Sequence, residues 1–233
     1  MNPAMSDGGA CIIVFAKAPV AGRVKTRLIP ALGAQGACDL HETLVRHTLA
    51  TVTRAQPCPV QLWCASSPAH ASFPHPFFES CRDIFSVSLH EQKGADLGER
   101  MDHALSTALQ TYAYAIIVGT DCPALTMDYL RQALDALRHG ARVVLGPAQD
   151  GGYVLMGARQ LHPSLFSGIT WGTASVLNDT RTRLRNLKWQ WRELAEQWDV
   201  DRPEDLPRLD MFFAEQRTPE PNPAPGRLNP PLT

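Results

Sequence analysis

A buried β-strand is predicted at Cys11-Ile12-Ile13-Val14-Phe15, where five apolar residues follow one another and three of them are β-branched. Short apolar runs of the same kind recur along the chain, bounded by Gly, Pro or Asp as buried strands are. Further strands are therefore predicted at 60–64, 84–89, 115–119 and 143–145, and an alternating, half-buried strand at 188–194.

Amphipathic helices are predicted between these strands. Apolar stripes at helical spacing occupy 97–112 and 130–137, and Asp96 with Glu99 predicts a capping box at the start of the first. Residues 36–54 and 174–186 are further candidates. This alternation predicts an α/β fold, Rossmann-like, with a mostly parallel central sheet covered on both faces. Because such sheets bind ligands beyond the carboxyl ends of their strands, we expect the site in the loops that follow strands.

The length and composition predict one globular domain. The chain has 233 residues, of which 44% are apolar and 19% charged. We place the domain at 10–216. Residues 1–9 are small and polar and are expected to be disordered. Residues 217–233 contain six of the 19 prolines, so we expect an extended or disordered Pro-rich tail there.

The charge balance restricts the class of partner. The chain has 22 basic and 23 acidic side chains, a formal net charge of -1. It therefore has no global positive field for nucleic acid or an acidic membrane, and a bound anion must meet a local cationic site. The six cysteines form no C-x-x-C pair, and the eight histidines lack zinc-site spacing. With no signal-peptide core or membrane span evident, we expect a cytoplasmic protein.

The loop after the first predicted strand supplies such a local cationic site. Lys17, Arg23, Lys25 and Arg27 lie within eleven residues that also contain Gly and Pro. Backbone N–H groups and cationic side chains can converge on a phosphate in a loop of this kind. It is not a P-loop, because Val24 rather than Gly precedes the lysine. A solvated basic turn is the structural alternative.

A second candidate loop follows the strand predicted at 115–119. Asp121 lies directly past that strand, on a turn shaped by Gly119 and Pro123. A carboxylate in this position suits Mg²⁺, which prefers one or two carboxylates together with phosphate oxygens and water. Alternatively, Asp121 caps the following turn. Cys122 is interpreted as a small buried neighbour rather than a nucleophile.

The third and fourth candidate loops are acidic. Residues 150–153 read Asp-Gly-Gly-Tyr, which permits either close backbone approach to a ligand or a tight hairpin. Pro203 with the acids after it has the chemistry of a helix start. That reading does not account for Asp199 and Asp201, which precede the helix and could complete a metal site with Asp121.

Taken together, the loops resemble the DUF2064 family of bacterial proteins, known also as transferase 1 associated with radical SAM and selenodomain proteins or as arsenosugar-biosynthesis glycosyltransferases. That family lies in the nucleotide-diphospho-sugar transferase superfamily, so the resemblance implies a glycosyltransferase A-like three-layer α/β/α sandwich. It covers about residues 12–206 and rests on motifs in the family's order: F-A-K-A-P-x-x-G-x-x-K-T-R-L from Phe15, Q-K-G-A-D-L-G-E-R-M from Gln92, G-T-D-C-P-A-L from Gly119, D-G-G-Y-V-L from Asp150 and D-V-D-R-P-E-D-L from Asp199.

The resemblance implies a role for each matching position. The nucleotide's diphosphate would be held by Lys17, Ala18, Pro19, Gly22, Arg23, Lys25 and Arg27. The base or ribose would lie near Gln92, Gly94, Asp96, Leu97 and Arg100. The transferred group or acceptor would face Asp150, Gly151, Gly152 and Tyr153. Mg²⁺ or Mn²⁺ would bind Asp121 and Asp201, and the candidate catalytic residues are Lys25, Asp121 and Asp150.

One departure from the common glycosyltransferase pattern bears on the reaction. Many of those enzymes carry a D-x-D metal motif, whereas the matching loop here has the single carboxylate of Asp121. A single carboxylate resembles the nucleotidyltransferase branch. The leading hypothesis is a Mg²⁺-dependent glycosyltransferase that transfers a glycosyl group from a nucleotide-activated donor to a small-molecule acceptor. The alternatives are a nucleotidyltransferase that releases pyrophosphate and a non-catalytic nucleotide-binding protein.

Overall fold

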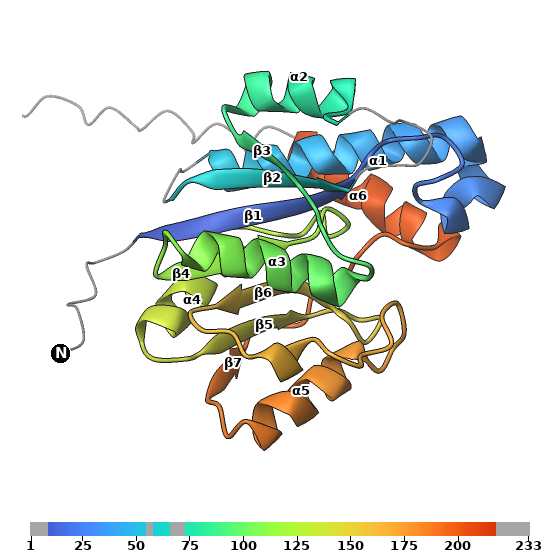
Figure 1. Cartoon of the computed structure of the whole chain (residues 1–233). Coiled ribbons are helices and arrows are strands. Elements are labelled where there is room, and N and C mark those ends of the chain that lie inside the picture. Colours follow the sequence, from blue (N-terminus) through green and yellow to red (C-terminus); the bar gives the residue numbers. More distant parts are fainter. Residues whose placement is uncertain (1–8, 55–57, 66–72, 218–233) are drawn as a thin grey trace, which may run out of the picture.

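A computed structural model of the chain describes residues 9–54, 58–65 and 73–217 (Figure 1). In chain order its strands and α-helices are β1 (Ala10–Lys17), α1 (Ile29–Thr53), β2 (Val60–Ala65), α2 (Pro76–Phe85), β3 (Ser88–Glu91), α3 (Leu97–Leu109), β4 (Tyr114–Val118), α4 (Met127–Arg138), β5 (Val143–Pro147), β6 (Tyr153–Ala158), α5 (Val176–Asn186), β7 (Trp191–Glu193) and α6 (Leu206–Arg217). Short 3-10 helices are η1 (Thr26–Leu28), η2 (Pro163–Leu165) and η3 (Pro203–Asp205).

The strands form one sheet in the order β3-β2-β1-β4-β6-β5-β7. The pairs β1–β2, β1–β4, β2–β3 and β5–β7 are parallel. Strand β6 is antiparallel to both β4 and β5. The prediction of a mostly parallel sheet is therefore confirmed, with β6 as the reversed strand.

Alternate side chains of β1 explain why helices cover both faces of the sheet. Ile12 and Val14 pack into a cluster with α1, α2 and α4, whereas Ile13 and Phe15 pack with α3 and α5. Ile12, Val14 and Ile13 have no exposed surface, and complete burial of such a side chain contributes roughly 1.5–3 kcal/mol. The layers are visible in Figure 1. The predicted three-layer α/β/α sandwich is confirmed.

A third apolar cluster connects the end of the chain to the loop after β1. Trp198, Val200 and Leu209 of the C-terminal segment pack against Leu28 of η1 and Leu44 of α1. Val200 and Leu28 are completely buried. This contact places the acidic segment around Val200 beside the cationic loop, although the two are far apart in sequence.

The predicted strand at 84–89 is wrong at its start. Ile84 and Phe85 end α2, Ser86 reverses the backbone in a left-handed conformation, and β3 begins at Ser88. Pro76 occupies the first turn of α2, and the preceding His75 caps its N-terminus, so local start signals outweigh the strand preference of Ile and Phe.

Other predicted boundaries shift in the same way. Helix α1 begins at Ile29 rather than at residue 36, and it is interrupted at Gly33, whose φ is 72°. At the other end of the sheet, β7 covers Trp191–Glu193 instead of 188–194, because Lys188 adopts a left-handed turn before it. The Asp96 cap of α3 is confirmed, since the Glu99 N–H donates to Asp96 Oδ1 at 2.8 Å, but the Glu99 side chain accepts from the Ala95 N–H at 2.7 Å rather than from Asp96 as a capping box requires.

The strand directions bring the candidate loops to one edge of the sheet. Strands β1, β4 and β5 end at this edge, and the antiparallel β6 begins there, so the turn between β5 and β6 joins the loops after β1 and β4. The expected disordered start and Pro-rich tail lie outside the described residues, except for residues 9 and 217. Within the described ranges, no helix is both long enough and apolar enough to cross a bilayer.

Candidate nucleotide and metal site

The loop after β1 is shaped by two left-handed residues. Gly22 has a φ of 79°, and Lys25 has φ 47° and ψ 41°. Between them the Arg23 N–H donates to the Val20 carbonyl at 2.8 Å and closes a turn. The left-handed conformation costs a residue with a Cβ roughly 1–2 kcal/mol, so the contacts of the Lys25 side chain must offset that cost.

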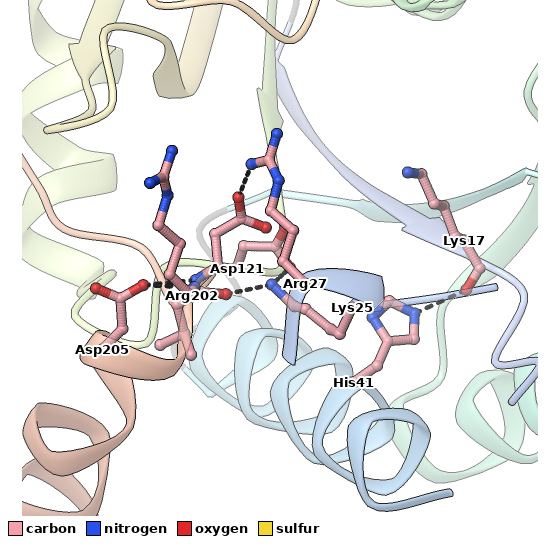
Figure 2. Close-up of polar contacts among 9 residues, drawn as sticks. Lys17, Lys25, Arg27, His41, Asp121, Arg202 and Asp205 are labelled. Carbon is pink, nitrogen blue, oxygen red and sulfur yellow. Dashed lines mark hydrogen bonds and ion pairs between the residues drawn. The ribbon is translucent and has the colours of Figure 1, made fainter. Parts of the chain in front are cut away.

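The ammonium group of Lys25 joins three segments of the chain. Its Nζ donates to the Val200 carbonyl at 2.5 Å and lies 2.7 Å from Asp121 Oδ1 (Figure 2). The Lys25 side chain is only 4% exposed, whereas that of Asp121 is 49% exposed. Asp121 therefore faces solvent on one side and a buried cation on the other, and its contact is this ion pair rather than a cap on the following turn.

A second ion pair lies beside the first. Arg27 Nη1 donates to Asp201 Oδ2 (Figure 2). Here the basic side chain is 58% exposed and the acidic one 33%. Each carboxylate expected to bind metal is thus paired with a cation of the loop after β1.

The acidic segment before α6 is held in place by backbone contacts. The Val200 N–H donates to the Asp121 carbonyl at 2.8 Å. Asp205 Oδ2 accepts from the N–H groups of Asp201 at 2.9 Å and Arg202 at 2.7 Å. The structural reading of Asp205 as part of a helix start is therefore right, and this cap also fixes the backbone of Asp201.

The Asp199 carboxyl is affected by burial and by the other charged groups of the site. Burial is the main cause that raises the pKa of its carboxyl to about 6; the carboxylates of Asp150, Asp121 and Asp201 act in the same direction, and Lys25 opposes them. Three other acidic side chains therefore lie within electrostatic reach of Asp199 at this edge of the sheet. A region of this kind attracts cations.

The Asp150 loop is the hairpin between β5 and β6. Asp150 Oδ1 accepts from the Gly152 N–H at 2.8 Å, and the Gly151 N–H donates to Ala148 at 3.1 Å. Gly151 has a φ of 88°, and a Cβ there would lie 2.3 Å from the Ala174 carbonyl oxygen. Gly151 thus has a structural reason, while the exposed Asp150 carboxylate remains at the edge of the site.

Tyr153 is turned inward at the start of β6. Its hydroxyl is buried beside Thr180, and burial raises its pKa. Cys122 is likewise 2% exposed, and burial raises the pKa of its thiol to about 12. A protonated buried thiol fits the interpretation of Cys122 as a packing residue.

The loop between β3 and α3 lies at the same edge but makes its own contacts. Gln92 Nε2 donates to the carbonyls of Trp63 at 2.8 Å and Ala16 at 3.3 Å, and so holds the ends of β2 and β1. Arg100 Nε donates to the Gly94 carbonyl at 3.1 Å. Within the described residues, no hydrogen bond or ion pair connects these side chains to Asp121 or Asp201.

The other loop residues divide into exposed and buried ones. Lys17 and Arg23 have exposed side chains, as phosphate-binding cations would. Ala18 is 5% exposed and its N–H donates to Ala65 at 3.2 Å, so it contributes to the sheet edge. The buried His41 of α1 fixes the end of β1 through an Nε2 contact of 2.9 Å with the Lys17 carbonyl (Figure 2).

Sequence reasoning missed the loop that contains Trp171. A Cβ added to Gly98, at the start of α3, would lie 2.6–2.8 Å from the Trp171 indole. The same loop reaches the β5–β6 turn at Ala174, which lies against Gly151, and the Leu177 N–H in the first turn of α5 donates to the Gly151 carbonyl at 2.9 Å. The segment from Trp171 to Leu177 thus contacts both the start of α3 and the Asp150 turn. A tryptophan between Gly168 and Gly172 was the available signal.

The fold is shared with solved transferase structures. A protein from Desulfovibrio desulfuricans G20, provisionally described as a nucleotide-diphospho-sugar transferase, is 31% identical and superposes with a TM-score of 0.76 over 90% of each chain. The 4-diphosphocytidyl-2C-methyl-D-erythritol synthase of Anaerococcus prevotii DSM 20548 is 9% identical, with a TM-score of 0.60 over 90% of this chain and 100% of that one.

A structure solved with a nucleotide and a metal ion also has this fold. Glucosyl-3-phosphoglycerate synthase from Mycobacterium tuberculosis, solved with Mn²⁺, UDP and glucosyl-3-phosphoglycerate, is 12% identical, with a TM-score of 0.55 over 90% of this chain and 76% of that one. At such identities the likeness concerns the fold alone. A search of curated proteins gave no match.

The family assignment rests on the sequence as well as the fold. The model of the family described as "uncharacterized protein conserved in bacteria (DUF2064)" matches residues 48–173. That range includes the α3 cap, the Asp121 loop, the Asp150 turn and Trp171, and it covers more than half of the chain. The protein therefore belongs to the DUF2064 family.

Proposed function

We propose that the protein is a divalent-metal-dependent transferase with a nucleotide-activated donor, and that it acts as a glycosyltransferase on a small-molecule acceptor. The observation that carries this proposal is the meeting of two loop cations with two carboxylates, Lys25 with Asp121 and Arg27 with Asp201. A metal-bound nucleoside diphosphate needs both kinds of group, because its phosphate oxygens attract cations and its metal ion attracts carboxylates.

The residues present suit a hard divalent cation. Asp121 and Asp201 offer carboxylate oxygens, and both side chains are partly exposed. In the part of the chain that the structure describes, no three or more His, Cys, Asp or Glu side chains are arranged to hold a metal on their own. Two carboxylates plus phosphate oxygens and water are what Mg²⁺ prefers, so we expect the metal to bind together with the nucleotide.

In glycosyl transfer, the basic and acidic residues of the site would have different roles. Lys17, Arg23 and Arg27 would neutralise the diphosphate as it leaves the sugar carbon. Asp150 would orient the acceptor hydroxyl and accept its proton as the new carbon–oxygen bond forms. A metal ion at Asp121 and Asp201 would add further positive charge at the leaving diphosphate.

Nucleotidyl transfer is the second candidate, and the single carboxylate in the loop after β4 favours it. In that reaction an acceptor phosphate attacks the α-phosphorus of a nucleoside triphosphate, and pyrophosphate leaves. The same cations and carboxylates would serve it, and a structure described as a cytidylyltransferase, from Leptospira borgpetersenii, has a similar fold. Support for glycosyl transfer comes instead from the 31% identical neighbour, which is provisionally described as a nucleotide-diphospho-sugar transferase.

Product analysis separates these reactions. The protein is incubated with Mg²⁺ and either nucleotide sugars or nucleoside triphosphates, with mixed small-molecule acceptors. Nucleoside diphosphate released from a nucleotide sugar supports glycosyl transfer. Pyrophosphate released from a triphosphate identifies the nucleotidyltransferase, and nucleotide binding without either product identifies a binding protein. Asp128→Asn is the matched control for the site variant Asp121→Asn, because Asp128 lies on α4 and pairs with Arg131 outside the site.

A further inference from the structure

We propose that the two ion pairs have different roles: Arg27–Asp201 opens when the metal-bound nucleotide enters, whereas Lys25–Asp121 stays closed as a permanent counter-ion. This inference rests on the proposed function, because it concerns how the expected metal and diphosphate reach the site. It assigns Arg27 as the residue that couples the two ligands and Lys25 as a positioning residue.

Lys25 and Arg27 differ in the number of contacts that each would lose on moving. Lys25 has two acceptors at 2.5 and 2.7 Å, one of them the carbonyl of the completely buried Val200. Moving its ammonium toward a phosphate would leave a buried carbonyl unpaired, and an unsatisfied buried acceptor is costly. Arg27 has Asp201 as its one hydrogen-bond acceptor in the described part of the chain, and it can leave without exposing an unpaired buried group.

The two ion pairs also differ in solvent exposure, and this difference likewise favours opening of Arg27–Asp201. The Lys25 side chain is 4% exposed and that of Arg27 is 58% exposed. Water replaces the partner of an exposed arginine at little cost, and such pairs are weak. Asp121 is half-exposed, so it can offer solvent-facing oxygen to a cation while Lys25 holds its other side.

The exchange of partners at Arg27 and Asp201 follows from competition between positive charges for the same carboxylate. When a divalent cation takes Asp201, it competes with Arg27 for the same carboxylate. The released guanidinium is planar and forked, which suits a phosphate, and the adjacent diphosphate is the acceptor that we expect it to find. Metal and nucleotide then favour each other's binding, because each compensates for the ion pair that the other breaks.

Direct measurement of Mn²⁺ binding without nucleotide tests the exchange. Free Mn²⁺ is titrated into the full chain and followed by its electron paramagnetic resonance signal. Arg27→Gln removes the competitor of the metal, so we expect Mn²⁺ to bind roughly twofold to fivefold more tightly than to the wild type, the range that an exposed ion pair can supply. Arg27→Lys keeps the positive charge and should bind Mn²⁺ as the wild type does.

Arg23→Gln is the matched control. Arg23 belongs to the same loop and is exposed, and within the described residues it forms no ion pair, so the variant loses the same charge without freeing a carboxylate. Equal Mn²⁺ affinity in Arg27→Gln and Arg23→Gln would overturn the exchange. The proposed function would survive that result if wild-type protein still bound nucleotides in a Mg²⁺-dependent way. Failure of wild type to bind Mn²⁺ with or without nucleotide would overturn both.

Discussion

Lys25 Nζ lies 2.7 Å from Asp121 Oδ1, and this contact joins the loop after β1 to the loop after β4. The same ammonium also binds the Val200 carbonyl, so one buried cation holds three loops at the edge of the sheet. The ends of β1 and β4 are already neighbours, because the two strands pair along their length. The ion pair therefore organises loops that the sheet has brought together.

Replacing Lys25 with Met should destabilise the fold. Methionine has a similar length but cannot donate to Val200 or compensate the charge of Asp121. We expect the free energy of unfolding to fall by about 1–3 kcal/mol, less than for a fully buried ion pair because Asp121 is half-exposed. Urea denaturation measures the change. Lys93→Met is the control, because Lys93 is exposed on the β3–α3 loop, and an equal loss in both variants would contradict the role of Lys25.

Stability should decrease in weakly acidic solution because of His41. Burial lowers the pKa of this imidazole below 6.5 in the folded protein. The unfolded chain then binds the proton more readily, so this contribution is intact above pH 6.5 and is lost as the pH falls through 6.5 toward the folded pKa. His41→Gln retains a donor for the Lys17 carbonyl but cannot titrate. The raised pKa of Asp199 acts in the opposite direction and in both proteins, so the test is the difference between them: from pH 7.5 to 5.5 the wild type should lose free energy of unfolding relative to His41→Gln. Parallel pH profiles would exclude His41 as the cause.

Gly98→Ala should disturb the Trp171 contact. The added methyl group would lie 2.6–2.8 Å from the indole, too close for both to keep their positions. We expect a loss of about 1–3 kcal/mol in stability, as for other overpacked sites, and a shift of tryptophan fluorescence. Gly36→Ala in α1 is the control, since its Cβ would meet only Leu32 Cβ at 3.2 Å. Unchanged fluorescence and stability in Gly98→Ala would show that Trp171 does not pack there.

The sheet was predictable because each strand carries its own signal. The β-branched runs at Ile12 and Ile116 mark β1 and β4, and the alternation of strands and helices predicts parallel pairing. The region around Ile84 failed because its apolar residues suit either a strand or one face of a helix. There the cap by His75 and the first-turn Pro76 favour the helix.

The site was predictable as a set of loops but not as a set of contacts. Asp121 stands out in sequence because it follows a buried strand. Its pairing with Lys25 depends on the left-handed backbone of that lysine and on the Val200 carbonyl, which lies 175 residues further along the chain. Backbone carbonyls carry no residue-type signal. For the same reason, the sequence did not indicate that Gln92 binds two strand-end carbonyls.

The central claim is that Asp121 forms part of a metal-dependent nucleotide site. Its most direct test is the thermal stability of wild-type protein and Asp121→Asn with nucleoside diphosphates and nucleotide sugars, each with and without Mg²⁺. Ligands that bind the folded state raise its melting temperature. We predict a Mg²⁺-dependent rise for the wild type, no such rise for Asp121→Asn, and a normal rise for Asp128→Asn. An identical Mg²⁺-dependent rise in Asp121→Asn and the wild type would contradict the account.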